Sequence, residues 1–178
     1  MTQKLFNDSE VYQKERPKKI TKEQEDDFYH DMAEQIIDNN WSKSPIEFII
    51  HDLSEVSISD SGYEIAKSLE GYRMRGSYDI DSSFIEFLEG LDYEKRLILR
   101  NNVKDWVKAH NPKPKFKKGD KLLVVESIFY EMKKDSIIYI TGNKEDEAVY
   151  YAHKNKDNNG GYVLDYEEVE NKCQLLND

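Results

Sequence analysis

The sequence predicts an α+β protein, with an all-α helical N-terminal domain followed by a small C-terminal β-barrel. Before residue 110, apolar residues recur every three or four positions, which is the period of an amphipathic helix. After residue 120 they come in short runs rich in Val, Ile and Tyr, which are typical of strands. Between these regions lie two prolines, a lysine cluster and a Gly-Asp turn. We therefore expect a flexible N-terminal arm, a helical domain, a basic hinge and a barrel, at residues 1–20, 21–110, 111–120 and 121–178.

The composition indicates a folded protein of the cytoplasm. Charged residues make up 35% of the 178 residues, but the 12% aromatic content argues against disorder. No apolar run approaches the roughly 18 residues of a membrane span, and the N-terminus lacks the apolar stretch of a signal peptide. The lone Cys173 fits a reducing compartment. Lys outnumbers Arg 21 to 5, a usage associated with low-GC bacteria and their phages.

The charge is distributed unevenly along the chain. The net charge of −10 disfavours direct binding to nucleic acid, which needs cations to neutralise phosphates. Residues 1–22 carry a net charge of +3, residues 23–92 carry −14, residues 93–121 carry +7 and residues 122–178 carry −6. Such sign asymmetry is a signal of a partner. The structural interpretation of the basic segment is that its cations lie against the acidic block; the alternative is direct contact with a nucleic-acid backbone.

Capping signals mark the expected helices. Thr21 and Gln24 have the spacing of a capping box, and the first helix should end near Asn39 and Asn40. In the second helix, Ser44 should be the N-cap, with Pro45 in the first turn. A short helix is expected over residues 63–70. Asp81 should cap a helix closed by Gly90, and Asp92 should cap another over residues 93–109.

Two surfaces of the helical domain are candidate partner-binding sites. The first helix places its acidic residues mostly off its apolar stripe, and we expect an acidic face made of Glu23, Glu25, Asp26, Asp27, Asp31, Glu34 and Asp38. The second candidate is a loop after the short helix, in which two arginines stand among tyrosines and a methionine. Arg, Tyr and Met are enriched at interface cores. The loop residues are Tyr72, Arg73, Met74, Arg75 and Tyr78. The alternative is an ordinary loop whose arginines pair with nearby carboxylates.

The C-terminal part resembles SH3-like barrels. The segment Phe116-Lys117-Lys118-Gly119-Asp120-Lys121-Leu122 is similar to the opening of that fold. Five short strands are expected: the first from the strand-like residues 122–125 and 128–130, and the others near residues 136–141, 148–153, 162–164 and 173–176. A one-turn helix should precede the last strand. The resemblance covers about residues 114–176 and implies that Phe116 closes one end of the barrel. Classical SH3 domains would add a tyrosine-lined peptide groove, but their tryptophan is not found in this part.

The sequence contains no recognisable catalytic or cofactor motif. It has no Gly-rich phosphate loop, no His-Glu-x-x-His and no Cys-x-x-Cys. None of the four histidines has the spacing of a metal ligand. We therefore expect a protein that works by binding, without a metal, a cofactor or an enzymatic activity.

In size, charge and composition the chain resembles phage-encoded anti-CRISPR and anti-restriction inhibitors. That resemblance implies an acidic DNA mimic, in which carboxylates of the acidic face occupy the basic groove of a bacterial nucleic-acid-binding protein, for example a Cas nuclease. A protein- or peptide-binding adaptor acting through the barrel is the first alternative. Nucleic-acid binding through residues 93–121 is the second.

Overall fold

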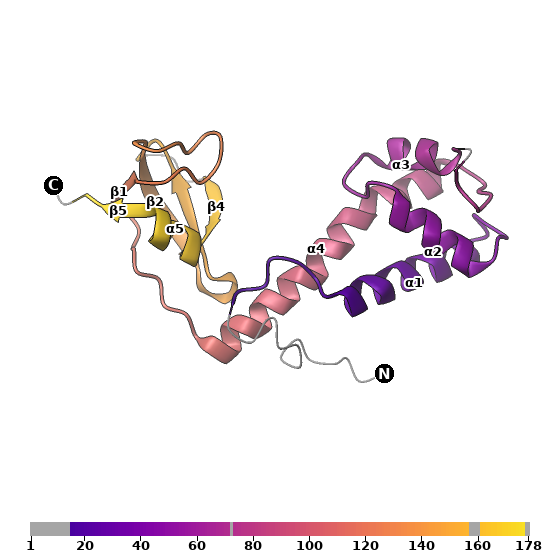
Figure 1. Ribbon diagram of the computed structural model, residues 1–178, viewed down its shortest axis with the longest axis horizontal. Coiled ribbons are helices and arrows are strands. Elements are labelled where there is room, and N and C mark those ends of the chain that lie inside the picture. The colour runs from indigo at the N-terminus through magenta and orange to yellow at the C-terminus, as the bar shows by residue number, and fades with distance from the viewer. Residues whose placement is uncertain (1–14, 72, 157–160, 177–178) are drawn as a thin grey trace. The chain divides into compact units, whose positions relative to one another are not determined.

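The computed structural model describes residues 15–71, 73–156 and 161–176. Two compact units are present, which we call the helical unit (residues 17–102) and the sheet unit (residues 103–178 together with residues up to Arg16). The α+β class is confirmed, because the structure combines helices with a five-stranded antiparallel sheet (Figure 1). The expected hinge, residues 111–120, falls inside the sheet unit. Residues 1–14 of the expected arm lie outside the described residues.

The helical unit consists of α1 (Lys22–Asp38), α2 (Ile46–Glu55), α3 (Gly62–Leu69) and the first part of α4 (Ser82–His110). The expected capping box opens α1: the Gln24 amide donates to Thr21 Oγ1 at 3.1 Å, and the Thr21 amide donates to Gln24 Oε1 at 3.0 Å. The helix ends as expected, with Asn39 at the C-cap and Asn40 at a φ of 58°. The buried side chains that hold these helices together include Phe28, Ile36, Ile49, Leu53, Leu69, Phe84 and Leu88.

The expected break after Gly90 is wrong, because α4 is one helix of 29 residues. Asp81 does cap it, accepting a hydrogen bond from the Phe84 amide at 2.8 Å. Gly90 continues the helix because Leu88 and Leu91, on either side of it, are both buried in the core. Their packing outweighs the roughly 1 kcal/mol that glycine costs relative to alanine. Asp92 is no cap, and instead pairs with Arg96 one turn on. Over the described residues, no helix is long and apolar enough to cross a membrane.

The expected N-cap of α2 is also wrong. Pro45 occupies that position without a side-chain hydrogen bond. The Ser44 hydroxyl is used elsewhere: it accepts a hydrogen bond from the Ser77 amide at 2.9 Å. Ser42 reinforces this contact by donating to the Ser77 carbonyl at 2.7 Å. These two serines therefore fix the end of the loop that carries Arg73 and Arg75, which we call the arginine-containing loop, rather than the start of α2.

The sheet unit contains β1 (Lys121–Val124), β2 (Ile137–Lys144), the 3-10 turn η3 (Glu145–Glu147), β3 (Val149–His153), β4 (Tyr162–Asp165), α5 (Tyr166–Lys172) and β5 (Cys173–Leu175). The strand order is β4-β3-β2-β1-β5, and every pairing is antiparallel. The sheet is open, since β4 and β5 do not pair over the described residues. A strand at residues 128–130 is not found; Phe129 and Met132 form an isolated bridge there.

The chain leading into β1 is held against the sheet by hydrogen bonds. The Phe116 amide donates to the Tyr150 hydroxyl at 3.0 Å, and that hydroxyl donates to Glu170 at 2.8 Å. The Lys115 amide also donates to Glu170, at 2.9 Å. Phe116 is itself buried, with its ring 5.9 Å from that of Tyr150. The second half of the lysine-rich segment is therefore part of the folded sheet unit.

Candidate functional site

The acidic residues of α1 form a continuous exposed face. Phe28, Met32, Ala33 and Ile36 are buried, so the positions on the opposite side of the helix lie in solvent. Asp27, Asp31, Glu34 and Asp38 follow each other at intervals of three or four residues and are all exposed. At 1.5 Å per residue, this row is about 16 Å long. Glu23 and Asp26 are also exposed, and they extend the acidic face toward the N-terminus of α1.

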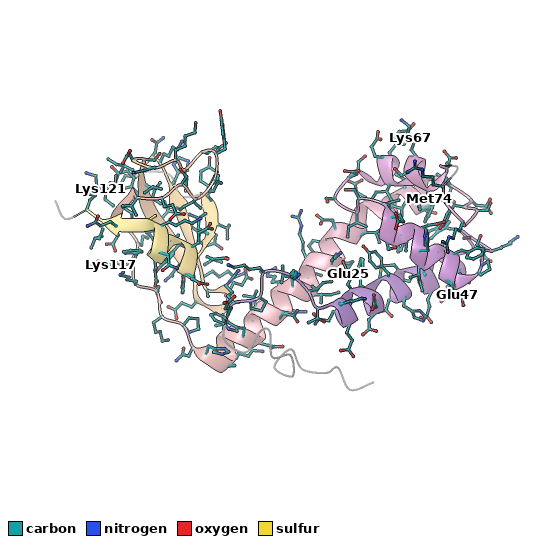
Figure 2. All side chains as sticks on the ribbon, viewed as in Figure 1. Glu25, Glu47, Lys67, Met74, Lys117 and Lys121 are labelled. Carbon is teal, nitrogen blue, oxygen red and sulfur yellow. The ribbon has the colours of Figure 1, made fainter. Side chains whose placement is uncertain are left out.

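Neighbouring cations neutralise little of this face. Glu25, which is labelled in Figure 2, is half-buried and pairs with Lys95 of α4. Glu34 lies 3.5 Å from His30, a contact that is ionic only when the imidazole is protonated. Among the described residues, no lysine or arginine forms an ion pair with Asp26, Asp27, Asp31 or Asp38. The expectation that basic residues of α4 lie against the acidic block, residues 23–92, thus holds for Lys95 and for Arg96, which pairs with Asp92, whereas Lys108 pairs with Asp105 outside that block.

The arginine-containing loop is organised by Asp52 of α2, a residue that the sequence did not single out. Its carboxylate is completely buried. The Arg75 amide donates to it at 2.9 Å, the Gly76 amide at 2.7 Å and the Tyr78 hydroxyl at 3.0 Å. An ionised carboxylate is stable in such a place only when hydrogen bonds replace its water. Asp52 therefore fixes the backbone at Arg75 and Gly76.

The ionisation of Asp52 follows from these contacts. Burial raises the pKa of the carboxyl, but the hydrogen bonds from Arg75, Gly76, Tyr78 and His51 outweigh it and hold the pKa below its ordinary value of 3.8. Burial and the adjacent carboxylate raise the pKa of Tyr78. At neutral pH the pair is therefore an anion that accepts a hydrogen bond from a neutral phenol.

The predicted loop residues have different surroundings. Arg73 and Arg75 are exposed, whereas Met74 and Tyr78 are half-buried. The Tyr78 ring stacks on Phe84 with the centroids 5.9 Å apart, so Tyr78 serves the core as well as the loop. Tyr72 lies outside the described residues. No carboxylate among the described residues forms an ion pair with Arg75.

An open groove of about 630 Å³ lies between α2, α3 and this loop. The loop contributes Arg73, Met74 and Arg75, and Met74 is seen beside α2 in Figure 2. The rest of the lining comes from His51, Glu55, Val56, Ser57, Asp60 and Ser68. The lining thus combines two arginines, two serines and two carboxylic acids with the apolar residues Val56 and Met74. Such a lining suits recognition of a charged segment.

Over the described residues, no cluster of three or more His, Cys, Asp or Glu side chains could hold a metal ion. Burial raises the pKa of the Cys173 thiol to about 11, and a thiol that stays protonated is a poor nucleophile. His51 Nδ1 lies 3.3 Å from Asp52, but that carboxylate is already committed to the loop.

In its described part, the sheet unit exposes one tyrosine and carries further aromatic side chains in contact with each other. Tyr130 is 83% exposed, the largest value among the exposed apolar side chains of the described residues. Next to it in the chain, the ring of Phe129 has its centroid 5.0 Å from that of Tyr162, and the Tyr162 ring stacks on His153. Tyr150, in contrast, is completely buried and unavailable to a ligand. The lysines of the basic segment at positions 113, 115, 117 and 118 are exposed.

Neither a protein-family model, a curated protein nor a solved structure matches this chain. Its function has to be inferred from the surfaces described above.

Proposed function

We propose that the protein is a non-enzymatic inhibitor that binds a bacterial nucleic-acid-binding enzyme through the acidic face of α1. The supporting observation is the row of exposed carboxylates at positions 27, 31, 34 and 38, three of which have no ion-pair partner among the described residues. A row of fixed negative charges attracts a surface shaped to hold phosphates and excludes DNA from it. The resemblance to anti-CRISPR and anti-restriction inhibitors in size, charge and composition implies a Cas nuclease or a restriction enzyme as the partner.

Neutralising the row tests this proposal. A variant with Asp27→Asn, Asp31→Asn, Glu34→Gln and Asp38→Asn should bind a Cas nuclease–guide complex or a restriction enzyme at least tenfold more weakly, because electrostatic complementarity is lost. The control carries Glu47→Gln, Glu64→Gln, Glu70→Gln and Glu86→Gln, which removes the same charge from exposed positions of the same unit. Binding should compete with DNA and weaken between about 50 and 300 mM salt. An equal loss of affinity in both variants would mean that only the net charge matters. Unchanged binding by the first variant would exclude the acidic face as the binding surface.

The second candidate is a peptide-binding adaptor with an SH3-like barrel. In support, β5 follows a short helix and pairs with β1, and Phe116, which the resemblance to that fold assigns to the end of the barrel, is buried. The exposed Tyr130 and its aromatic neighbours would form the binding surface. In that case Tyr130→Ala would abolish partner binding while neutralisation of the α1 face would leave it intact, as measured by calorimetry on the full chain.

A further inference from the structure

We propose that the groove between α2, α3 and the arginine-containing loop binds a carboxylate-rich segment of a partner protein. This surface is separate from the acidic face of α1 and has the opposite charge preference. Binding at this groove requires only that the protein has a protein partner. That partner can be a nucleic-acid-binding enzyme or the target of an adaptor.

The first argument is that the loop is fixed before any ligand arrives. Asp52 receives hydrogen bonds from two consecutive backbone amides, those of Arg75 and Gly76. The next residue, Ser77, is held through both its amide and its carbonyl by Ser44 and Ser42. A loop held at successive residues loses little conformational entropy on binding, which is the main benefit of preorganisation.

The second argument is charge. The helical unit contains nineteen acidic and ten basic side chains, yet no described carboxylate pairs with the exposed Arg75. A guanidinium offers a planar fork of donors that matches a carboxylate. Arg73 lines the same groove, so a ligand carboxylate at Arg75 would lie near a second guanidinium, with Glu55 and Asp60 elsewhere in the lining. The hydroxyls of Ser57 and Ser68 line the groove as further hydrogen-bond donors.

The residues that line the groove also favour a peptide over a nucleic acid as the ligand. Glu55 and Asp60 lie in the same groove as the arginines. A nucleic-acid strand carries a charge at every nucleotide, about every 3.4 Å, and would bring phosphates against these carboxylates. A peptide can place a glutamate at Arg75 and an uncharged side chain elsewhere. Val56 and the half-buried Met74 provide an apolar contact for such a side chain.

The experiment uses the full-length protein labelled with ¹⁵N and a synthetic peptide of alternating glutamate and leucine as the probe. Titration up to about 2 mM, the range of weak single contacts, should shift the backbone amides of residues 56–57, 68 and 73–76 and the side-chain Nε–Hε signal of Arg75. The same peptide with glutamine in place of glutamate should produce no shift. The double variant Arg73→Glu/Arg75→Glu should weaken the interaction at least tenfold.

A matched double variant, Lys18→Glu/Lys43→Glu, changes the net charge equally at exposed positions outside the groove, and it should bind the peptide like the parent. Loss of binding in this control, retention of binding in the arginine variant, or equal shifts with the glutamine peptide would overturn the proposal. So would larger shifts of the same amides by an oligodeoxynucleotide, because the ligand would then be a phosphate. Neutralising the α1 face should leave these shifts unchanged, which separates this surface from the one proposed above.

Discussion

Both units of the molecule use a buried polar side chain to fix an irregular segment, but the helical unit uses a charged group and the sheet unit a neutral one. In the helical unit the anion of Asp52 holds residues 75–78. In the sheet unit the Tyr150 hydroxyl connects the Phe116 amide to Glu170, and so holds the entry to β1. A buried charge costs far more free energy than a buried hydroxyl if its hydrogen bonds fail.

The net charges of the two units increase this difference in free-energy cost between the buried carboxylate and the buried hydroxyl. The helical unit carries −9 and the sheet unit −1, counting residues 17–102 against all the others. A buried anion in the acidic unit is therefore opposed both by desolvation and by its neighbours. A neutral pair or an apolar side chain in place of Asp52 would avoid both costs. That an anion stands there nevertheless favours a role in which the position of the arginine-containing loop matters.

The largest expected effect comes from Asp52→Ala. The substitution leaves the Arg75 and Gly76 amides and the Tyr78 hydroxyl without their acceptor and should destabilise the helical unit by about 3–4 kcal/mol. Urea unfolding would be followed by Trp41 fluorescence in a Trp106→Phe background, so that the signal reports on the helical unit. The exposed groove residue Asp60 provides the control, and Asp60→Asn should change the stability by less than about 0.5 kcal/mol. Equal midpoints for the two variants would contradict the anchoring role.

The pH dependence of that contribution follows from the lowered pKa of Asp52. Between the folded-state pKa and the ordinary value of 3.8, the unfolded chain binds a proton that the folded chain does not. The stabilisation is therefore fully present above the unfolded pKa and decreases as the pH falls through the folded one. The difference in unfolding free energy between the parent and Asp52→Asn should be constant from about pH 8 to pH 5 and smaller below about pH 4. A constant difference down to pH 3 would show that the charge is not what stabilises the loop.

The corresponding change in the sheet unit, Tyr150→Phe, should have a smaller effect. It removes the acceptor of the Phe116 amide and one donor to the Glu170 carboxylate, and it should cost about 1–2 kcal/mol because Glu170 keeps the hydrogen bond from the Lys115 amide. Limited trypsin digestion provides the measurement: the bonds after Lys115, Lys117 and Lys118 should be cut slowly in the parent and faster in the variant. Tyr151→Phe, on the neighbouring half-buried position, is the control. Rapid cleavage of the parent would mean that the lysine-rich segment is a loose linker.

The sequence predicted those features whose signals are local. The capping box of α1 and the Asn39–Asn40 end depend on residues within one turn of each other, and both were found. Asp52 was missed because its partners are backbone amides more than twenty residues away, which carry no side-chain signature. The acidic face followed from helical spacing, whereas the openness of the sheet depends on pairings between distant strands that no short pattern specifies.

Gly90→Ala should have the smallest effect on stability. It should stabilise the protein, whereas Asp52→Ala and Tyr150→Phe should destabilise it. Gly90 lies inside α4 without a positive φ, and a Cβ there would meet nothing within 4 Å. Alanine should therefore stabilise the helical unit by about 0.5–1 kcal/mol, because it restricts the unfolded chain and favours the helix. This gain corresponds to a rise of about 1–4 °C in the melting temperature measured by circular dichroism. Gly119 of the sheet unit is the matched control: it has equal space, but its φ of +96° is strained for alanine, so Gly119→Ala should lower the stability. A destabilising Gly90→Ala would indicate that the helix does break there, as the sequence pattern had suggested.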